Sequence, residues 1–403
     1  MSWNDKVIWS EGMFLQPQHF QQHDRYLERL IESRTAPIAA HHWGFMNLLI
    51  DEAALALGKI ALTSARGIMP DGTPFDFPNT DPAPPPLDIP REAKNQAIVL
   101  ALPMRRYGSD GADDDGGLAR HSLSDFEVQD SGAAERGALL QVGRLRLRVL
   151  LQNDATAAYA NLGIARVIER RADNQLVLDR GYIPPTLSIR NNGILSGYAA
   201  ELRGLLHQRG DALGGRLSQP GRGGVAEIAD FLLLQTVNRF EPLFSHFAQS
   251  PLLHPQQLYA TCLSLAGDLS TFSRENRRPL AYPDYVHDDL ENSFAPLMAD
   301  LRRSLSMVPE QRVIPIELKD RSYGVRVAII PDLDLLKSAS FVLAVNAQVP
   351  PEALRNRFPT QVKIGPVERI RDLVNLHLPG IPLHSLPVAP RQIPYHAGFN
   401  YFE

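Results

Sequence analysis

The sequence of 403 residues contains only one cysteine, Cys262, so the chain cannot form a disulfide bond within itself. A chain of this size with so little cysteine is typical of a reducing compartment. The sequence also lacks an uninterrupted apolar stretch of the roughly 20 residues that a membrane-spanning helix requires. Its first residues, Met1–Lys6, lack the apolar run of a signal peptide. We therefore expect a cytoplasmic chain that does not insert into a membrane.

An excess of either charge is missing as well. Lys and Arg total 41 and Asp and Glu total 45, which gives a formal net charge of −4. Binding to nucleic acid or to an anionic membrane usually requires a basic patch or a basic excess. We therefore expect no nucleic acid partner. We expect the chain to bind partner proteins through complementary shape and apolar contact. The length favours two or three domains, because a domain typically holds about 100 to 200 residues.

Complete sequence motifs for catalysis or metal binding are also absent, and three partial matches fail for identifiable reasons. His19 and His23 are spaced for half of a zinc site on a helix, but the intervening glutamate of a metalloprotease and a third ligand are missing. The acidic run Asp110–Gly116 misses the first and last ligand positions of a calcium loop. The glycine-rich match Gly221–Ala226 precedes a helix but does not follow a strand. The sequence thus predicts no enzymatic activity, no metal and no cofactor.

The fold class predicted is multidomain α+β, and its first part, residues 1–189, is predicted to be a β-sandwich with a leading interaction segment. From Gly44 to Ile189 the apolar residues occur in short runs separated by Pro, Gly and Asp, which is typical of many short strands. The Pro-Asp-Gly sequence within Met69–Thr73 predicts a hairpin turn. The prolines between residues 80 and 90 predict an extended surface loop that cannot join the interior of a sheet. Helical spacing over Gln18–Ser33 predicts a helix ahead of the strands.

Residues 190–311 are predicted to form a four-helix bundle, because the apolar period changes there to steps of three and four residues. The predicted stripes are Leu195, Ala199, Leu202 and Leu206; Val225, Ile228, Ala229, Leu232, Thr236, Val237, Phe240, Phe244 and Phe247; Leu258, Cys262, Ala266 and Leu269; and Leu290, Phe294, Leu297, Leu301, Leu305 and Val308.

The second of these helices has one turn that is apolar on every side. It consists of Phe231, Leu232, Leu233 and Leu234. A surface helix of one small bundle cannot cover all of these side chains, whereas further copies of the chain can do so. The alternative is that this helix lies at the centre of its own bundle. Both readings remain open on the residues alone.

Residues 312–403 are predicted to form a small α+β domain. Strands are expected at Val313–Glu317, Val325–Ile330 and Phe341–Val345, and short helices at Pro351–Phe358 and Val367–Leu376. A last strand, expected at Tyr395–Tyr401, has no evident return partner in the sequence.

Large apolar side chains are concentrated at the N-terminus, ahead of any predicted core. The pattern there is Val7-x-Trp9-x-Glu11-Gly12-Met13-Phe14-Leu15-x-Pro17-x-His19-Phe20. It is followed in order by Leu57-Gly58-Lys59, Met69-Pro70-Asp71-Gly72, the helical middle and Leu386–Tyr395. Together these motifs resemble the TssK family, also called ImpJ or VasE, the trimeric baseplate components of bacterial type VI secretion systems.

The resemblance implies a structural adaptor and not an enzyme. Family members are expected to have a β-sandwich shoulder similar to phage receptor-binding proteins, a helical neck and a C-terminal head, assembled as a homotrimer. The shoulder is expected to hold the TssF and TssG baseplate wedge. The head is expected to contact the cytoplasmic parts of TssL and TssM, which would dock the protein at the inner face of the cytoplasmic membrane. The resemblance also suggests that several tens of residues are absent at the C-terminus.

Three sets of residues are candidates for these contacts. Apolar and aromatic anchors dominate the energy of protein interfaces, which favours the N-terminal segment for baseplate binding. The baseplate candidates are Trp9, Met13, Phe14, Leu15 and Phe20; the trimer candidates are Phe231, Leu232, Leu233 and Leu234; the membrane-complex candidates are Arg355, Arg357, Arg369 and Arg371. The alternative for the first set is that it attaches the terminus to its own sandwich. The alternative for the arginines is a solvated helix face.

Two other classes of function remain open on the sequence. A trimeric receptor-binding protein of the phage type would share the sandwich and the trimer but would bind a glycan or another surface receptor. A hydrolase would need a pocket with converging titratable groups.

Overall fold

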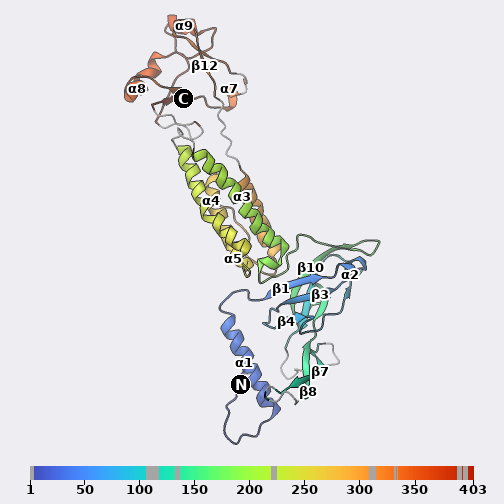
Figure 1. Cartoon of the computed structure of the whole chain (residues 1–403). Coiled ribbons are helices and arrows are strands. Elements are labelled where there is room, and N and C mark those ends of the chain that lie inside the picture. The colour runs from blue at the N-terminus through green and yellow to red at the C-terminus, as the bar shows by residue number, and fades with distance from the viewer. Residues whose placement is uncertain are drawn as a thin grey trace. The chain divides into compact units, whose positions relative to one another are not determined.

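A computed structural model describes residues 4–105, 118–130, 132, 137–218, 225–307, 315–330, 333, 335–387, 393 and 398–403. The chain is a mixture of helices and small sheets, which confirms the predicted α+β class (Figure 1). It divides into two compact units, one of Met1–Arg203, Pro242–Gly267 and Arg278–Arg302, and one of Gly204–Glu241, Asp268–Arg277 and Arg303–Glu403. The predicted acidic loop Asp110–Gly116 and the glycines Gly221–Gly224 lie outside the described residues.

Two antiparallel sheets form the β part of the first unit. One has the order β1 (Gly44–Ile50), β3 (Leu62–Ile68), β4 (Pro74–Phe77). The other has the order β11 (Leu176–Leu178), β10 (Tyr159–Arg170), β6 (Lys94–Pro103), β9 (Arg148–Leu151). Smaller elements are α2 (Glu52–Ala56), η1 (Gln152–Asp154) and η2 (Ile189–Asn191).

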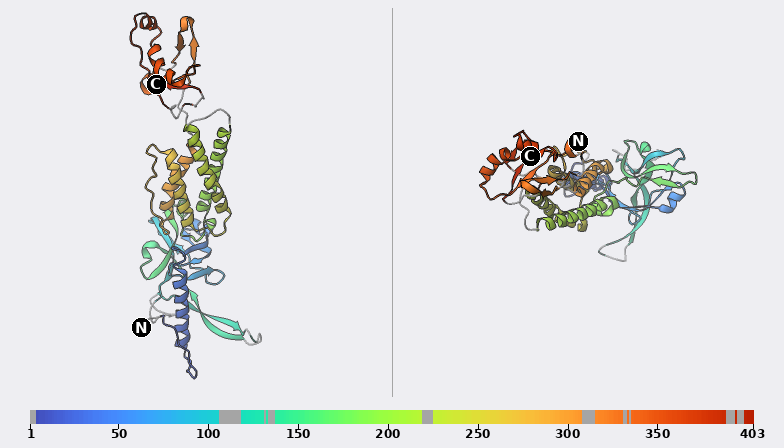
Figure 2. Two further views of the ribbon diagram at one scale, coloured as in Figure 1. Left: turned by 90° about the vertical axis from the view of Figure 1, so that its left-hand side faces the viewer. Right: turned by 90° about the horizontal axis from the view of Figure 1, so that it is seen from above.

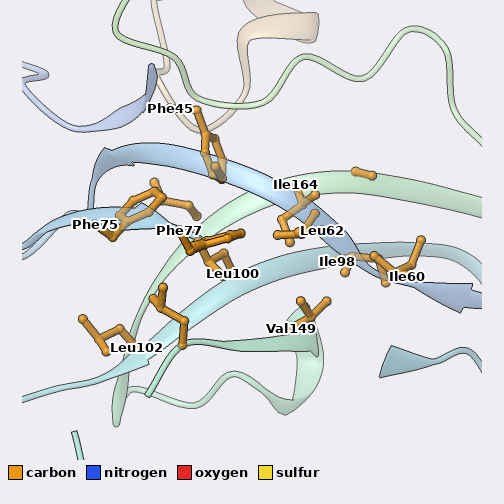
Figure 3. Packing of buried hydrophobic residues seen from close by; sticks show 14 of the residues in the cluster. Phe45, Ile60, Leu62, Phe75, Phe77, Ile98, Leu100, Leu102, Val149 and Ile164 are labelled. Atoms are coloured by element: carbon orange, nitrogen blue, oxygen red, sulfur yellow. The ribbon is translucent and has the colours of Figure 1, made fainter. Parts of the chain in front are cut away.

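A single hydrophobic core joins these sheets. Phe45 and Phe77 from the first sheet and Leu100 and Ile164 from the second all belong to it, as Figure 3 shows. β6 is central because its run Ile98–Leu102 is apolar at every position and is buried throughout, which is typical of a strand covered on both faces. The short apolar runs of the sequence therefore correspond to the strands of this core.

The turn chemistry of the sequence is also seen in the structure. Gly72 has a φ of +83°, and the amide of Met69 donates to the carbonyl of Thr73 at 2.9 Å, which closes the predicted hairpin between β3 and β4. The proline-rich loop is not wholly irregular, however. Its last residues form β5 (Leu87–Asp88), which pairs with β2 (Lys59–Ile60) in a two-stranded sheet. Both strands of such a pair are edge strands, so the pairing agrees with the prediction that this segment does not join a sheet interior.

A long hairpin projects from this unit as a separate two-stranded ribbon. It consists of β7 (His121–Gln129) and β8 (Gly137–Leu145), paired antiparallel from His121↔Leu145 to Gln129↔Gly137. Neither strand pairs with another strand in the described part of the chain. Figure 2 shows the ribbon extending away from the other strands of its unit.

Four long helices follow the strands of the first unit. They are α3 (Gly193–Leu217), α4 (Val225–Gln249), α5 (Pro255–Ser273) and α6 (Leu290–Ser306). Contacts within each unit pair α3 with α6 through Tyr198 and Phe294, and α4 with α5 through Arg239 and Asp268. The predicted stripes of α3, α5 and α6 are buried at every described position, which confirms these three core faces. Val308, the last predicted stripe residue, lies outside the described residues.

The predicted core face of α4 was wrong in its first half. Ile228 and Leu232 are exposed, whereas Leu233 is buried and continues the buried face of Val237 and Phe240. The reason is that the turn Phe231–Leu234 is apolar on every side, so hydrophobicity could not indicate which residue faces the core.

The C-terminal part of the second unit contains small sheets and short helices. β12 (Leu318–Asp320) pairs with β13 (Arg326–Ala328), and a second sheet has the order β14 (Leu343–Val345), β16 (Asn400–Phe402), β15 (Ser385–Leu386). The helices are η3 (Ser322–Gly324), α7 (Leu335–Ser338), α8 (Pro351–Gln361) and α9 (Ile370–Asn375), of which α8 and α9 were predicted.

Two strand predictions in this region need correction. β16 pairs with β14 on one side and β15 on the other, so the prediction that the last strand lacks a partner was wrong. The strand predicted at Val313–Glu317 instead begins at Leu318, and Val313 and Ile314 lie outside the described residues. Within the described residues, no helix is both long enough and apolar enough to cross a bilayer.

Candidate interaction surfaces

The N-terminal segment lies along helix α1 (Pro17–Thr35), which the sequence predicted over Gln18–Ser33. A capping box starts the helix: Gln16 and His19 satisfy each other's exposed backbone amides, and Pro17 occupies the first turn. The side-chain amide of Gln22 donates to the carbonyl of Asp5 at 2.7 Å, which fixes the segment alongside the helix.

The baseplate candidates form an apolar surface on this segment. The indole of Trp9 packs against the rings of Phe20 and His23, with centroids 6.2 and 5.9 Å away. Phe14 is 87% exposed, and Leu15 and Phe20 are also exposed, while Met13 is half-buried. We call Trp9, Met13, Phe14, Leu15 and Phe20 the N-terminal patch. The chain's own core does not cover it.

The apolar surface continues along α1 beyond these candidates. Leu27, Leu30 and Ile31 are exposed, and no residue of the helix is buried. Together with Phe20 they lie within about 100° of one another around the helix, at about 100° per residue. We call Phe20, Leu27, Leu30 and Ile31 the α1 strip. A helix with such a strip is normally covered by another element.

The trimer candidates on α4 divide into two groups. Leu233 is 6% exposed and belongs to the chain's own core, and Leu234 is half-buried. Phe231 is 63% exposed, and Leu232 is exposed as well. One turn further back, Ile228 extends the same exposed apolar surface. The structure therefore leaves Phe231 and Leu232, and not Leu233, available to a partner.

The four arginine candidates are all exposed, and they lie on or directly before the C-terminal helices. On α8, Leu354 is buried and Phe358 packs on Phe402 with centroids 5.0 Å apart, so the opposite side of the helix faces solvent. The side chain of Arg357 is exposed, whereas the Nε of Arg355 donates to the Asn400 side chain at 3.3 Å. Arg369 precedes α9, and Arg371 lies in its first turn.

A stack of three histidines joins the segment after α1 to the helices of the first unit. His287 lies face to face with His41 and His254, at centroid distances of 5.1 and 5.2 Å. Its Nε2 donates to the Trp43 carbonyl at 2.8 Å, and its Nδ1 accepts from the Tyr285 hydroxyl at 2.7 Å. Burial, together with the neighbouring imidazoles, lowers the pKa of His287 to about 4. His287 is therefore neutral at physiological pH.

A groove in the first unit does not have the chemistry of an active site. It has a volume of about 890 Å³ and is lined by Arg166, Tyr182 and Glu291 among others. The Arg166 guanidinium donates to Asp179 and to Glu291 at 2.8 Å each, and it lies over the Tyr182 ring. Burial raises the pKa of Tyr182 to about 12, so its phenol stays protonated at neutral pH. Arg166 is thus held by two carboxylates, and the described residues that line the groove include no Ser, Thr, Cys, Lys or His side chain to act as a nucleophile.

No cluster of three or more metal-ligating side chains occurs among the described residues. His19 and His23, which the sequence spaces for half of a zinc site, instead both lie near the Trp9 ring. Both imidazoles therefore pack around the Trp9 indole at the N-terminal patch.

One surface that the sequence analysis did not single out lies on the β7–β8 hairpin. Directly opposed residues of an antiparallel pair share a face. One face therefore carries two opposed pairs, Phe126 with Leu140 and Val128 with Ala138, and all four residues are exposed. The alternation of Phe126 and Val128 with Asp125 and Glu127 is the sequence signal for a strand with one apolar face.

Comparisons with known proteins identify the relatives of this chain. The family model described as bacterial type VI secretion, VC_A0110, EvfL, ImpJ, VasE matches residues 19–403. The chain is also 51% identical to the type VI secretion system baseplate component TssK1 of Pseudomonas aeruginosa PAO1, over all of this chain and 92% of that protein. The chain belongs to the TssK family of type VI secretion proteins.

Solved structures of TssK agree with the fold described above. A crystal structure of TssK superposes with a TM-score of 0.75 at 45% identity, covering 99% of this chain and 91% of the other. TssK in a cryo-electron microscopy structure of the TssK–TssF–TssG baseplate subcomplex superposes with a TM-score of 0.66 at 30% identity, covering 75% of this chain and 98% of the other. The relatives are baseplate components and not enzymes, in agreement with the prediction from sequence.

Proposed function

We propose that this member of the TssK family is a homotrimeric adaptor that joins a TssF/TssG baseplate wedge to the cytoplasmic parts of TssL and TssM, docked at the inner face of the cytoplasmic membrane. The observation that carries the proposal is the N-terminal patch on a chain whose relatives are baseplate components. One solved relative is a TssK bound with TssF and TssG.

The N-terminal patch has the composition expected of a docking anchor. Aromatic and large aliphatic side chains dominate the binding energy at interfaces, provided that they become buried on binding. Phe14 is almost fully exposed in the isolated chain, and Trp9 is held by rings of α1 in a fixed position. A side chain that is already positioned loses less conformational entropy when it binds. We therefore assign wedge binding to this patch.

The head contact rests on the exposed arginines. A guanidinium forms paired hydrogen bonds with a carboxylate, so an acidic surface is the expected complement. Among the described residues, Arg357, Arg369 and Arg371 make no ion pair, and Arg355 is held by Asn400. Three heads in one trimer multiply the strength of individually weak contacts through effective concentration.

Co-purification with the wedge tests the proposal. A tagged chain should retain TssF and TssG, and the double variant Phe14→Asp/Leu15→Asp should retain at least tenfold less, because charge at an apolar anchor opposes its burial. Leu57→Asp is the matched control, since Leu57 is also exposed but lies away from the patch in sequence, after α2. Deleting residues 1–20 should likewise abolish retention and leave the fold intact. Undiminished retention by the double variant would refute this binding site.

A further inference from the structure

We propose that the β7–β8 hairpin is an intersubunit arm whose apolar face lies on the α1 strip of a second copy of this chain. This inference rests on the proposed homotrimer and names the surfaces that join its subunits. The arm face consists of Phe126, Val128, Ala138 and Leu140. The α1 strip consists of Phe20, Leu27, Leu30 and Ile31.

The hairpin needs a covering partner on physical grounds. An isolated two-stranded ribbon is marginally stable in water, and three strands or a packed helix are normally required. The ribbon has nine paired positions on each strand, and Phe126 and Leu140 are both about half exposed. Within the described residues, the ring of Phe126 is contacted by the Arg144 guanidinium, which lies near the base of the ribbon. Its outer part has no cover within the described chain.

The chain itself supplies an apolar surface on an element of similar length. α1 has 19 residues and is about 28 Å long, at about 1.5 Å per residue. Each hairpin strand has nine residues and is about 30 Å long, at about 3.4 Å per residue. A helix laid on the apolar face of a ribbon is a standard packing of two layers. Both surfaces are exposed in this chain, so a chain's own hairpin does not cover its own α1.

The area involved favours several copies over a single pairwise contact. A ribbon about 30 Å long and 10 Å wide covers on the order of 300 Å² on each side, or about 600 Å² per contact, whereas a stable interface usually buries about 1,200 Å² or more. The two surfaces differ, so the contact is head to tail, and such contacts close into a ring when the rotation permits. In a closed trimer each chain takes part in two such contacts, one through its hairpin and one through its α1.

The opposite face of the hairpin provides a matched control. Leu139 and Leu140 are adjacent and identical in type, but they point to opposite faces of the ribbon. Leu139 is 71% exposed and lies opposite Glu127, while Leu140 is 47% exposed and lies opposite Phe126. Only Leu140 belongs to the arm face. A substitution at Leu139 therefore tests general effects on the ribbon without removing the proposed contact.

The experiment uses cross-linking between two differently tagged full-length copies produced in the same cells. One copy carries Leu30→Cys and the other Leu140→Cys, and a short bis-maleimide reagent is added to the purified protein. The native Cys262 is fully buried and does not compete for the reagent. We expect a covalent dimer that carries both tags, and at least a fivefold weaker band when Leu139→Cys replaces Leu140→Cys. Leu30 is used because Phe20 also belongs to the N-terminal patch.

The outcomes separate this inference from the proposed trimer. The mass of the unsubstituted protein, measured by light scattering, reports the trimer by itself. A trimeric mass without the two-tag band, or with equal bands for both leucine positions, overturns the hairpin contact and leaves the trimer standing. A single chain with Leu30→Cys and Leu140→Cys that links only within itself also overturns it. The mass of one chain contradicts both proposals.

Discussion

At the residue scale, buried polar groups hold the first unit together at defined points. His254 donates through Nε2 to the His41 carbonyl at 2.9 Å, and its Nδ1 accepts from the Gln256 amide at 3.1 Å. His287 is bonded at both ring nitrogens in the same way. Each ring therefore already has a hydrogen-bond partner at both nitrogens in its neutral form. A second proton would turn the accepting nitrogen into a donor, and that nitrogen already faces a donor, so the hydrogen bond would be lost.

These histidines predict that the protein loses stability in acid. Burial lowers the pKa of His254 as well as that of His287. Below about pH 6.5 these two histidines therefore bind protons in the unfolded chain but remain neutral in the folded chain until a lower pH. The free energy of unfolding should be highest above about pH 6.5 and should fall towards pH 4, by about 1.4 kcal/mol per pH unit for His287. Urea unfolding between pH 7.5 and 4.5 measures this slope.

The variant His287→Phe separates the titration from the packing. Phenylalanine keeps a ring in the stack but cannot bind a proton, so the variant should be less stable at neutral pH and should show a shallower dependence on pH. An unchanged slope would show that other groups control the acid sensitivity.

A buried arginine leads to a second prediction. Arg120 is 4% exposed and donates to the Asp71 carboxylate at 2.8 Å and to the hydroxyl of Thr73. Removing one partner of a buried pair leaves an uncompensated charge, which typically costs about 3 to 5 kcal/mol. Asp71→Ala should therefore lower the free energy of unfolding by about 3 kcal/mol in chemical denaturation. Adding Arg120→Met should restore part of the loss, and a double variant no more stable than Asp71→Ala would argue against the charge explanation.

At the element scale, periodicity predicted the helices well but could not orient every one of them. The stripes of α3, α5 and α6 each have polar residues on the other side of the helix, so only the apolar side can face the core. On α4 the turn Phe231–Leu234 gives no such contrast, and the side that faces the core is decided by packing with α3 and α5. The exact register of a helix depends in such cases on contacts that the sequence pattern does not contain.

The two neighbouring leucines of α4 give a matched test of that assignment. Leu233→Ala should lower the free energy of unfolding by about 2 to 5 kcal/mol, because it leaves a cavity in the chain's own core. Leu232→Asp should leave the unfolding midpoint nearly unchanged and should lower the trimer fraction in sedimentation. The reverse pattern would show that Leu233, and not Leu232, faces another subunit.

The surfaces were predictable from sequence to different degrees. The N-terminal patch was indicated by its position ahead of any core, and the structure leaves most of it exposed. The hairpin face was not singled out, although its alternation is visible in the sequence. Alternation predicts one apolar face but does not reveal that the strand leaves its sheet and exposes that face. The histidine stack depends on His41, His254 and His287, which are far apart in sequence and meet only in the folded unit.

At the scale of the whole molecule, folding of one chain leaves apolar side chains exposed on several elements. They lie on the N-terminal segment, on α1, on the β7–β8 hairpin and on α4, with Phe14, Ile31, Leu140 and Phe231 as examples. Exposed apolar surface on this scale usually marks interaction sites. Their separation over distinct elements fits a protein that binds copies of itself and the baseplate wedge at the same time.

The measurement that tests this account most directly is the mass of the purified full-length protein at micromolar concentration, determined by multi-angle light scattering. The account expects three times the mass of one chain, because the exposed apolar surfaces become buried between subunits. A uniform, stable species with the mass of one chain would contradict it.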